Sequence, residues 1–245
     1  MKNEIKQLNE MINSSKRIVF FGGAGVSTES GIPDFRSSDG IFSVYEGKDI
    51  PPEIIVSRSF FDHYPDEFFS FYKDRMIYEE AKPNAAHLKL AEMEKAGKLS
   101  AIITQNIDGL HTKAGSKNVY ELHGSTSRNY CVDCHKEYST KEILNQKNDI
   151  PRCYECGGII RPDIVLYEEN LSDYILKKSI NAISLADMLI IGGTSLLVYP
   201  AEELIYYYSG HKLVVINKTP LKLDRPIDLF IQDKIGEVLS QVILE

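Results

Sequence analysis

The four cysteines of the chain form two matched pairs, Cys131-x-x-Cys134 and Cys153-x-x-Cys156. Residues 135–152, 18 in number, separate the pairs, which fits the C-x2-C-x15–20-C-x2-C spacing typical of zinc sites. Four thiolates complete a tetrahedron around one ion and leave no coordination position open for substrate. We therefore predict one structural zinc ion. Redox-active thiols are the alternative, but redox chemistry does not need two matched pairs.

A glycine-rich turn follows an apolar run. Ile18-Val-Phe-Phe21 is typical of a buried strand, and Gly23 and Gly25 then allow the backbone to turn tightly beside a ligand. A helix beginning just after this turn would direct free N–H groups at a phosphate. The dinucleotide fingerprint is incomplete, because Thr28 takes the place of its third glycine and no acidic residue clearly ends the second strand. The next residues, Gly31-Ile-Pro-Asp-Phe-Arg36, add a carboxylate, an aromatic ring and a guanidinium, which is more chemistry than a phosphate loop needs.

Further polar side chains follow other apolar runs. They are Gln105, Asn106 and Asp108, then His123, Thr194, Ser195 and Asn217. Ligands bind at the carboxyl ends of the strands in an open α/β sheet, so we expect these side chains to meet there. His123 has an ordinary pKa of about 6.5 and is the candidate general base. We interpret His87 and His111 as structural.

The elements that must position these groups alternate between strands and helices. We predict strands at 18–21, 99–105, 119–122, 159–167, 188–191 and 213–216, and helices at 2–14, 59–78, 84–96, 172–186, 200–208 and 235–243. Residues 37–58 are expected to form a long surface loop. This alternation is typical of α/β proteins with a mostly parallel sheet and helices on both faces.

The composition is that of an ordinary globular protein, with 245 residues, 43% hydrophobic, 26% charged and a net charge of −7. This mild acidity gives no electrostatic basis for direct binding to nucleic acid. No apolar run approaches the ~20 residues of a membrane span, and the N-terminus lacks the apolar core of a signal peptide. We therefore expect a cytoplasmic protein with no membrane partner, whose reduced cysteines bind metal instead of forming disulfides.

A series of motifs along the chain closely resembles the sirtuins, the NAD-dependent protein lysine deacylases. It begins with Gly23-Ala-Gly25-x-Ser27-x-x-Ser30-Gly-Ile-Pro-Asp-Phe-Arg36. It continues through Thr104-Gln-Asn-Ile-Asp108, Leu122-His-Gly124, the two cysteine pairs, Arg161-Pro-x-Ile-Val165, Gly193-Thr-Ser-Leu196 with Val198 and Pro200-Ala201, and Ile216-Asn217. The motifs follow the family's order and cover nearly the whole chain. The compact length resembles that of bacterial or archaeal members.

The resemblance implies a Rossmann-like NAD-binding domain formed by residues 1–36, 84–126 and 161–245. A smaller domain would contain a helical insert with a cofactor loop, residues 37–83, and a zinc-ribbon module, residues 127–160. NAD, as a co-substrate, and an acyl-lysine would meet in the cleft between the two domains.

The resemblance also implies roles for individual residues around NAD. Ala24, Thr28, Phe35 and Arg36 would surround the nicotinamide ribose and pyrophosphate, Gln105 would contact the ribose, Asn106 would help to hold a water, and Ile107 and Asp108 would hold the nicotinamide amide. Thr194, Ser195, Asn217, Asp233 and Lys234 would surround the phosphates and adenosine. Gly23, Gly25, Asp34, His123 and Gly193 complete the cofactor-binding set.

The implied reaction is NAD-dependent deacetylation of protein lysine. The acyl-lysine carbonyl oxygen attacks C1′ of NAD as nicotinamide leaves, and a ribose hydroxyl activated by His123 then takes the acyl group. The products would be lysine and 2′-O-acetyl-ADP-ribose, so the enzyme would be an acyltransferase. Asn106 and Asp108 join His123 in the catalytic set. We expect a monomer that acts on acyl-lysine proteins or peptides.

The family pairs its substrate peptide by strand addition, so residues 164–167, including Val165 and Tyr167, should form an exposed edge strand. Val198 should help to wall the acyl-lysine channel. Where the family usually has Phe/Tyr-Gly-Glu, this chain has Tyr167-Glu168-Glu169. We expect the additional carboxylate to shift peptide preference toward basic flanking residues without abolishing catalysis.

Other functions stay open. Tyr72-x-x-Arg75 resembles the pair with which some sirtuins hold succinyl or malonyl carboxylates, although Tyr72 lies in an aromatic-rich segment and Arg75 has acidic neighbours. Mono-ADP-ribosyl transfer to proteins passes through the same activated C1′. A non-catalytic NAD or zinc-ribbon binding module would not need a base such as His123, and a hydride-transfer dehydrogenase would need a complete fingerprint. Deacetylation is the first prediction.

Overall fold

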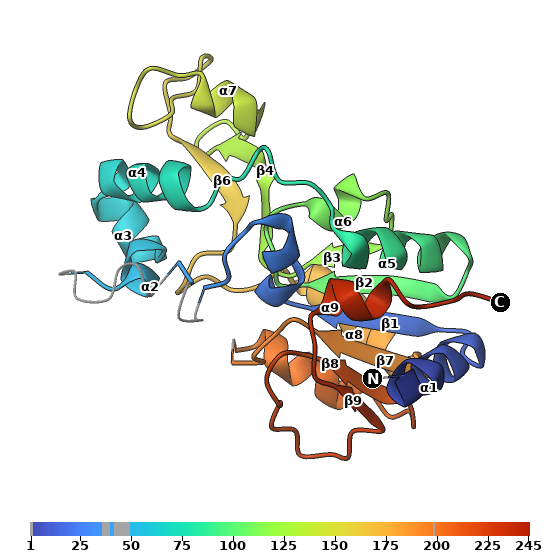
Figure 1. The fold of residues 1–245 in the computed structure, drawn as a ribbon. Helices are drawn as coiled ribbons and strands as arrows, with labels where there is room; N and C mark the ends of the chain where they lie inside the picture. Colours follow the sequence, from blue (N-terminus) through green and yellow to red (C-terminus); the bar gives the residue numbers. More distant parts are fainter. Residues whose placement is uncertain (1, 36–39, 42–49, 198) are drawn as a thin grey trace.

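The computed structural model describes residues 2–35, 40–41, 50–197 and 199–245. Two sheets, one of six strands and one of three, organise these residues (Figure 1). In the described part of the chain, no helix combines the length and the apolar character needed to cross a membrane.

The six strands of the larger sheet are all parallel. They are β1 (Ile18–Gly22), β2 (Leu99–Thr104), β3 (Val119–Glu121), β7 (Met188–Gly192), β8 (Leu213–Ile216) and β9 (Leu229–Ile231). Their spatial order is β3-β2-β1-β7-β8-β9, which is the doubly wound Rossmann order, with its reversal between β1 and β7. The predicted parallel α/β sheet is confirmed.

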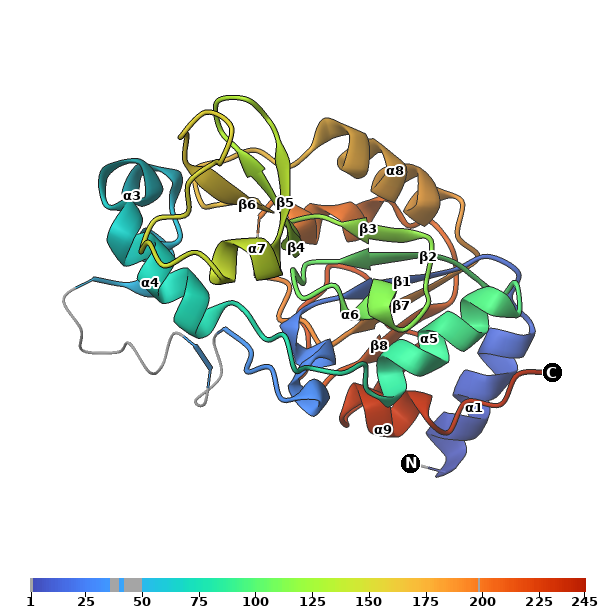
Figure 2. The same cartoon turned by 90° about the horizontal axis from the view of Figure 1, so that it is seen from above.

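Helices cover both faces of this sheet. On one face lie α1 (Lys2–Asn13), α5 (Ala85–Lys95) and α9 (Ile235–Leu239), and on the other lie α8 (Asp173–Ser184) and the 3-10 helix η4 (Ala201–Tyr207) (Figure 2). Successive side chains of β1 therefore enter different cores. Phe20 packs in the core on the α1 side and Phe21 in the core on the α8 side. This burial on both faces explains why the central strands are continuously apolar.

The smaller sheet is antiparallel, with the order β5-β4-β6. It contains β4 (Gly124–Cys131), β5 (Glu137–Ser139) and β6 (Ile160–Ile164), and α7 (Thr140–Leu144) follows β5. The helical insert consists of α2 (Pro52–Ile55), α3 (Arg58–His63) and α4 (Pro65–Arg75). Phe68 and Tyr72 of α4 belong to the same buried cluster as Cys131 and Ile160, so the zinc-ribbon segment and the helical insert share one core.

Several predicted elements need correction. The strand β9 was not predicted, because the three residues Leu229–Ile231 are too few to show a periodicity. The helix α2 falls in the predicted loop 37–58, where Pro52 occupies a favourable first position of the helix. The strand expected at 159–167 ends at Ile164, and the helix expected at 235–243 ends at Leu239. The domain boundaries proposed near 126 and 161 fall within β4 and β6 and stay a proposal.

Candidate active site

The loop after β1 packs directly against the loop after β7. The Gly25 N–H donates to the Gly193 carbonyl oxygen at 2.8 Å. A Cβ atom on Gly25 would lie 2.8 Å from Gly193 Cα, and a Cβ atom on Gly193 would collide with the Val26 nitrogen. Both positions therefore require glycine. Their contact joins the two loops where the strand order reverses, which is the ligand-binding crevice of such sheets.

Gln105 bridges the ends of β2 and β7. Its Oε1 accepts a hydrogen bond from Thr194 Oγ1 at 2.8 Å, and the Thr194 carbonyl accepts one from Asn217 Nδ2 at 3.1 Å. The Gln105 Nε2 is buried and has no hydrogen-bond partner among the described residues. An unpaired buried donor costs about 1–3 kcal/mol, so this amide fits an acceptor on a ligand, such as a ribose hydroxyl of NAD.

Ser27 joins the glycine loop to the segment after β2. Its hydroxyl accepts from Asn106 Nδ2 at 3.0 Å and donates to Asp108 Oδ2 at 2.6 Å. Asp108 Oδ1 also accepts from the Leu110 N–H at 2.8 Å, at the start of α6 (Leu110–Lys113). Ser27 thus holds two predicted catalytic side chains. The motif contains Ser27, but spacing along the chain does not reveal this contact.

A pocket lies between the large sheet and the helical insert. Its lining comes from three segments: Ala24, Ser27, Ile32, Pro33, Phe35 and Ile41 after β1, Asn106, Ile107 and Asp108 after β2, and Arg75, Met76 and Tyr78 at the end of α4. Mostly apolar walls with a few convergent polar groups are typical of cofactor sites. The pocket brings together Ala24, Phe35, Asn106, Ile107 and Asp108 from the predicted NAD set.

His123 lies between β3 and β4, at the carboxyl end of the sheet. Its Nδ1 is 2.9 Å from the Gln105 carbonyl oxygen. Because a carbonyl oxygen only accepts, Nδ1 carries the proton and Nε2 keeps its lone pair. Burial lowers the pKa of His123, and the bond to Gln105 opposes this shift without cancelling it. The ring is therefore neutral at pH 7, and Nε2 can accept a proton as a general base must.

The four cysteines converge as predicted. Their sulfur atoms all lie within 4.8 Å of one another, with Cys131 and Cys156 at 3.4 Å and Cys134 and Cys153 at 3.5 Å. Zn–S bonds of about 2.3 Å place tetrahedral sulfurs about 3.8 Å apart, so the cluster fits one zinc ion. Tyr138 Oη donates to Cys153 Sγ at 3.1 Å. This bond is the main cause that lowers the pKa of Cys153 to about 6.

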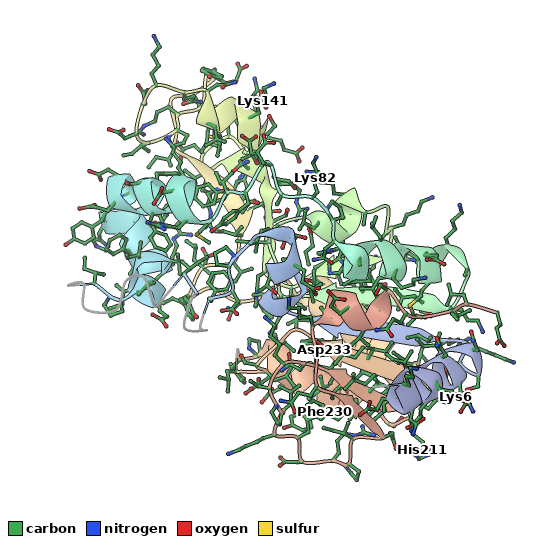
Figure 3. The ribbon with its side chains drawn as sticks, in the orientation of Figure 1. Lys6, Lys82, Lys141, His211, Phe230 and Asp233 are labelled. Carbon is green, nitrogen blue, oxygen red and sulfur yellow. The ribbon has the colours of Figure 1, made fainter. Side chains whose placement is uncertain are left out.

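The remaining residues of the predicted NAD set are spread around these loops. Thr28 Oγ1 donates to the Gly25 carbonyl oxygen at 3.0 Å. Asp233 follows β9 (Figure 3) and accepts from the Lys234 N–H at 2.7 Å, just before α9. Ser195 is exposed, Asp34 is half-buried, and a Cβ on Gly23 would lie 2.8 Å from Gln105 Oε1. Arg36 and Val198 lie outside the described residues, so their roles stay predictions.

The exposed edge strand predicted over 164–167 is present only at its first residue, because β6 ends at Ile164. β6 is an edge strand, and beyond its end the Val165 carbonyl oxygen accepts no hydrogen bond from the described residues. Tyr167 differs, because its N–H donates to Val56 and its carbonyl accepts from the Arg58 N–H, both at 3.0 Å. The prediction of a free edge strand over 164–167 is therefore wrong for Tyr167, whose main chain pairs with the helical insert. The Val165 carbonyl oxygen remains available beside His123, because the Val165 N–H donates to the His123 carbonyl oxygen at 3.0 Å.

Tyr72 and Arg75 both lie on α4 but do not line one cavity together. Tyr72 is fully buried, and its ring stacks on Phe68 with centroids 6.0 Å apart. The Tyr72 hydroxyl has no hydrogen-bond partner among the described residues. Arg75 lines the pocket and pairs with Asp74 at 2.6 Å. Of the two, Arg75 alone belongs to the described pocket lining.

Comparisons with known proteins agree with this geometry. Residues 23–200 match the model of the Sir2 family. A Clostridium perfringens protein described as an NAD-dependent protein deacetylase is 59% identical over 244 residues, which cover 99% of this chain and 100% of the relative. A Staphylococcus aureus protein with the same description is 42% identical over 245 residues, which cover 100% of this chain and 100% of the relative.

Solved structures give the same result. A structure described as Sir2 with a p53 peptide and NAD+ matches with a TM-score of 0.85 and 39% identity, covering 97% of this chain and 96% of that chain. Another, described as Sir2 bound to acetylated peptide, matches with a TM-score of 0.84 and 38% identity over the same shares of the two chains.

Proposed function

Because the chain belongs to the Sir2 family, we propose that it is an NAD-dependent protein lysine deacetylase. The observation that carries this proposal is the double role of Gln105. Its carbonyl oxygen holds the proton of His123 on Nδ1, and its side-chain amide is a buried donor without a partner among the described residues. A general base and a ligand-binding donor therefore meet at one point of the sheet edge.

The residues of the pocket have separable tasks. His123 Nε2 accepts the proton that a substrate hydroxyl must lose to become a nucleophile. Ser27 holds Asn106 and Asp108 in fixed positions, from which they bind polar ligand atoms. Phe35 adds an aromatic wall to the same pocket, which favours the exclusion of water from the reacting groups. NAD supplies the ribose that takes up the acyl group.

The finer parts of the proposal concern products and partners. The acetyl group would move to the 2′ oxygen of ADP-ribose, which makes the reaction an acyl transfer. The substrate would be acyl-lysine in a protein or peptide, as the description of a similar structure with acetylated peptide supports. The net charge of −7 argues against a nucleic-acid partner. We expect a monomer. A location in the reducing cytoplasm would keep the four thiols available for zinc.

One observation favours a second candidate activity, removal of succinyl or malonyl groups. Arg75 lines the pocket beside Asn106 and Ile107, and a guanidinium suits a carboxylate. Tyr72 gives no support, because it is buried in the aromatic core of α4.

The test is peptide-dependent release of nicotinamide. Purified protein is incubated with NAD and an acetyl-lysine peptide, or with NAD and the unmodified peptide. The proposal predicts nicotinamide only with the acetylated peptide. Absence of release with every acylated peptide in a panel of acetyl, succinyl and longer chains contradicts it.

A further inference from the structure

A second hollow lies against the helical insert and is lined in part by Tyr167. We call it the flank groove and define it by its lining: Glu53, Ile54, Ser57, Ser59, Phe60, His63, Tyr64, Tyr167 and Glu168. None of these residues lines the pocket beside Asn106 and Asp108. Ile54, Tyr64 and Tyr167 are 51%, 53% and 40% exposed. Large apolar side chains that are exposed around one hollow mark a binding surface.

Glu168 is fixed at the rim of this groove by two hydrogen bonds. Its Oε2 accepts from the Ser59 N–H at 2.9 Å and from Ser59 Oγ at 2.5 Å. These bonds lower the pKa of the Glu168 carboxyl, so the group is ionised at neutral pH. Its backbone has a φ of 75°, a left-handed conformation that is unfavourable for a residue other than glycine. The Glu168 side chain is therefore held in place by Ser59, although the backbone conformation at this position favours glycine.

The flank groove continues from the proposed substrate edge. Tyr167 lines the groove and lies two residues after Val165, whose carbonyl oxygen is available for strand addition. Strand residues advance by about 3.3 Å each. If the peptide pairs with Val165, a residue a few positions from the acyl-lysine in the peptide sequence would therefore reach the groove.

The chemistry of the lining selects the occupant. Its apolar side chains, such as Ile54 and Tyr64, suit an aliphatic stem, and its carboxylates, Glu53 and Glu168, suit a cation at the tip. The neighbouring cation Arg58 does not neutralise them, because it pairs with Asp62 at 2.9 Å and with Glu169 at 3.3 Å. His63, at the rim, is bonded through Nδ1 to the Ser59 carbonyl at 2.8 Å.

We propose that the flank groove is a subsite for a lysine or arginine side chain that lies near the acyl-lysine of the substrate. The inference deepens the proposed function and rests on it, because it assumes that the acylated peptide binds along Val165. It gives the enzyme a preference for acylated lysines in basic segments of proteins.

The experiment uses acetyl-lysine peptides in which each of the three positions on either side carries, in turn, lysine, norleucine, alanine or glutamate. The readout is the ratio of kcat/KM for lysine to that for norleucine, which isolates the charge because the two stems are alike. Within one variant this ratio cancels any general effect on folding or turnover. We expect a ratio of about two to five at one position, the size of an exposed ion pair, with norleucine better than alanine and glutamate poorest.

The variants assign the effect to the groove. In Glu168→Gln and Glu53→Gln the ratio should fall toward one, whereas the matched control Glu67→Gln, an exposed acid on α4, should keep it. Equal rates for lysine and norleucine at all six positions, an unchanged ratio in both groove variants, or a preference for glutamate would overturn the proposal. If no peptide is turned over, the proposed deacetylase function is wrong. Fluorescence polarisation with the same peptides then measures the ratio of affinities for the lysine and norleucine peptides, which still decides whether the groove binds a basic side chain.

Discussion

The Nδ1 atom of His123 lies 2.9 Å from the main-chain oxygen of Gln105. The same residue, Gln105, bridges β2 to β7 through its hydrogen bond with Thr194. The backbone therefore sets the tautomer of the base, and one residue fixes both the imidazole and the edge of the nucleotide site. The pH dependence of the enzyme follows from this relationship.

The first prediction concerns pH. The proposed mechanism requires neutral His123, and burial lowers the pKa of this ring below its ordinary value. Deacetylation should therefore retain more than half of its kcat/KM at pH 6.5, with the midpoint of its acid limb below that value. A pH–rate profile for an acetyl-lysine peptide checks this. An acid limb with an apparent pKa above 6.5 would contradict the described environment of the ring.

The second prediction concerns Ser27 as a positioning residue. Ser27→Ala removes the hydroxyl that joins Asn106 to Asp108, and leaving the buried Asn106 Nδ2 without this partner costs about 1–3 kcal/mol. We expect kcat/KM for NAD to fall about tenfold or more. Ser70→Ala, an exposed serine on α4, is the matched control. Equal NAD kinetics in the two variants would show that the hydrogen-bonded chain does not support binding.

The third prediction concerns the zinc site. Tyr138 is buried and donates to Cys153 Sγ, and groups that bond to metal ligands typically contribute 10–100-fold to metal affinity. Tyr138→Phe should therefore release zinc to a coloured chelator about tenfold faster than the parent protein. Tyr154→Phe, which changes a 71% exposed ring, should match the parent. Identical release rates in both variants would show that Tyr138 does not stabilise the zinc site.

The fourth prediction concerns stability in acid. His87 and His111 are buried side by side, with ring centroids 4.7 Å apart. Burial lowers the pKa of His87 to about 4 and that of His111 to about 3. The unfolded chain, with histidine pKa values of about 6.5, binds more protons below that pH than the folded protein does. The stability that these neutral rings provide is complete above pH 6.5 and falls as the pH drops toward 4.

His111→Leu tests this window. Each histidine contributes up to about 1.4 kcal/mol of unfolding free energy per pH unit, so the variant should show a slope smaller by about that amount between pH 6 and 5. Urea unfolding at several pH values measures the slope. His211→Leu, at an exposed position on the outer surface (Figure 3), should leave it unchanged. The same slope in the parent protein, His111→Leu and His211→Leu would argue against a role of the buried histidine pair in the pH dependence of stability.

The fifth prediction separates the two acyl preferences. If Arg75 binds an acyl carboxylate, Arg75→Met should lower the ratio of desuccinylation to deacetylation about tenfold, the size of one charge-assisted hydrogen bond. Lys82→Met changes an exposed cation between α4 and α5 (Figure 3) and should preserve the ratio. Equal loss of both reactions in Arg75→Met would reject the anionic-acyl activity.

The sequence was sufficient for the features that are local. The strand Ile18–Gly22 and its parallel neighbours follow from apolar runs, and the zinc cluster follows from the spacing of two cysteine pairs. Short elements such as β9 exist only because a neighbouring strand pairs with them, so their residues carry little local signal. The paired main chain of Tyr167 likewise depends on a distant segment, at Val56 and Arg58.

Within the site, residue types were more predictable than their connections. The motif that contains Gln105, Asn106 and Asp108 identified a cluster at the sheet edge. It did not reveal that Ser27 would join Asn106 to Asp108, since the contact spans parts of the chain that meet only after folding. The fixed carboxylate of Glu168 is a similar case, because Ser59 is brought to it by α3.

The most direct test of the central claim follows the fate of the acetyl group. Protein, NAD and an acetyl-lysine peptide are incubated together, and all products are identified by mass spectrometry beside His123→Ala. The proposed reaction yields nicotinamide, deacetylated peptide and acetyl-ADP-ribose in equal amounts, at a rate about 10²–10⁴-fold lower in the variant. Protein-bound ADP-ribose with the peptide still acetylated, or no peptide-dependent nicotinamide, would contradict it.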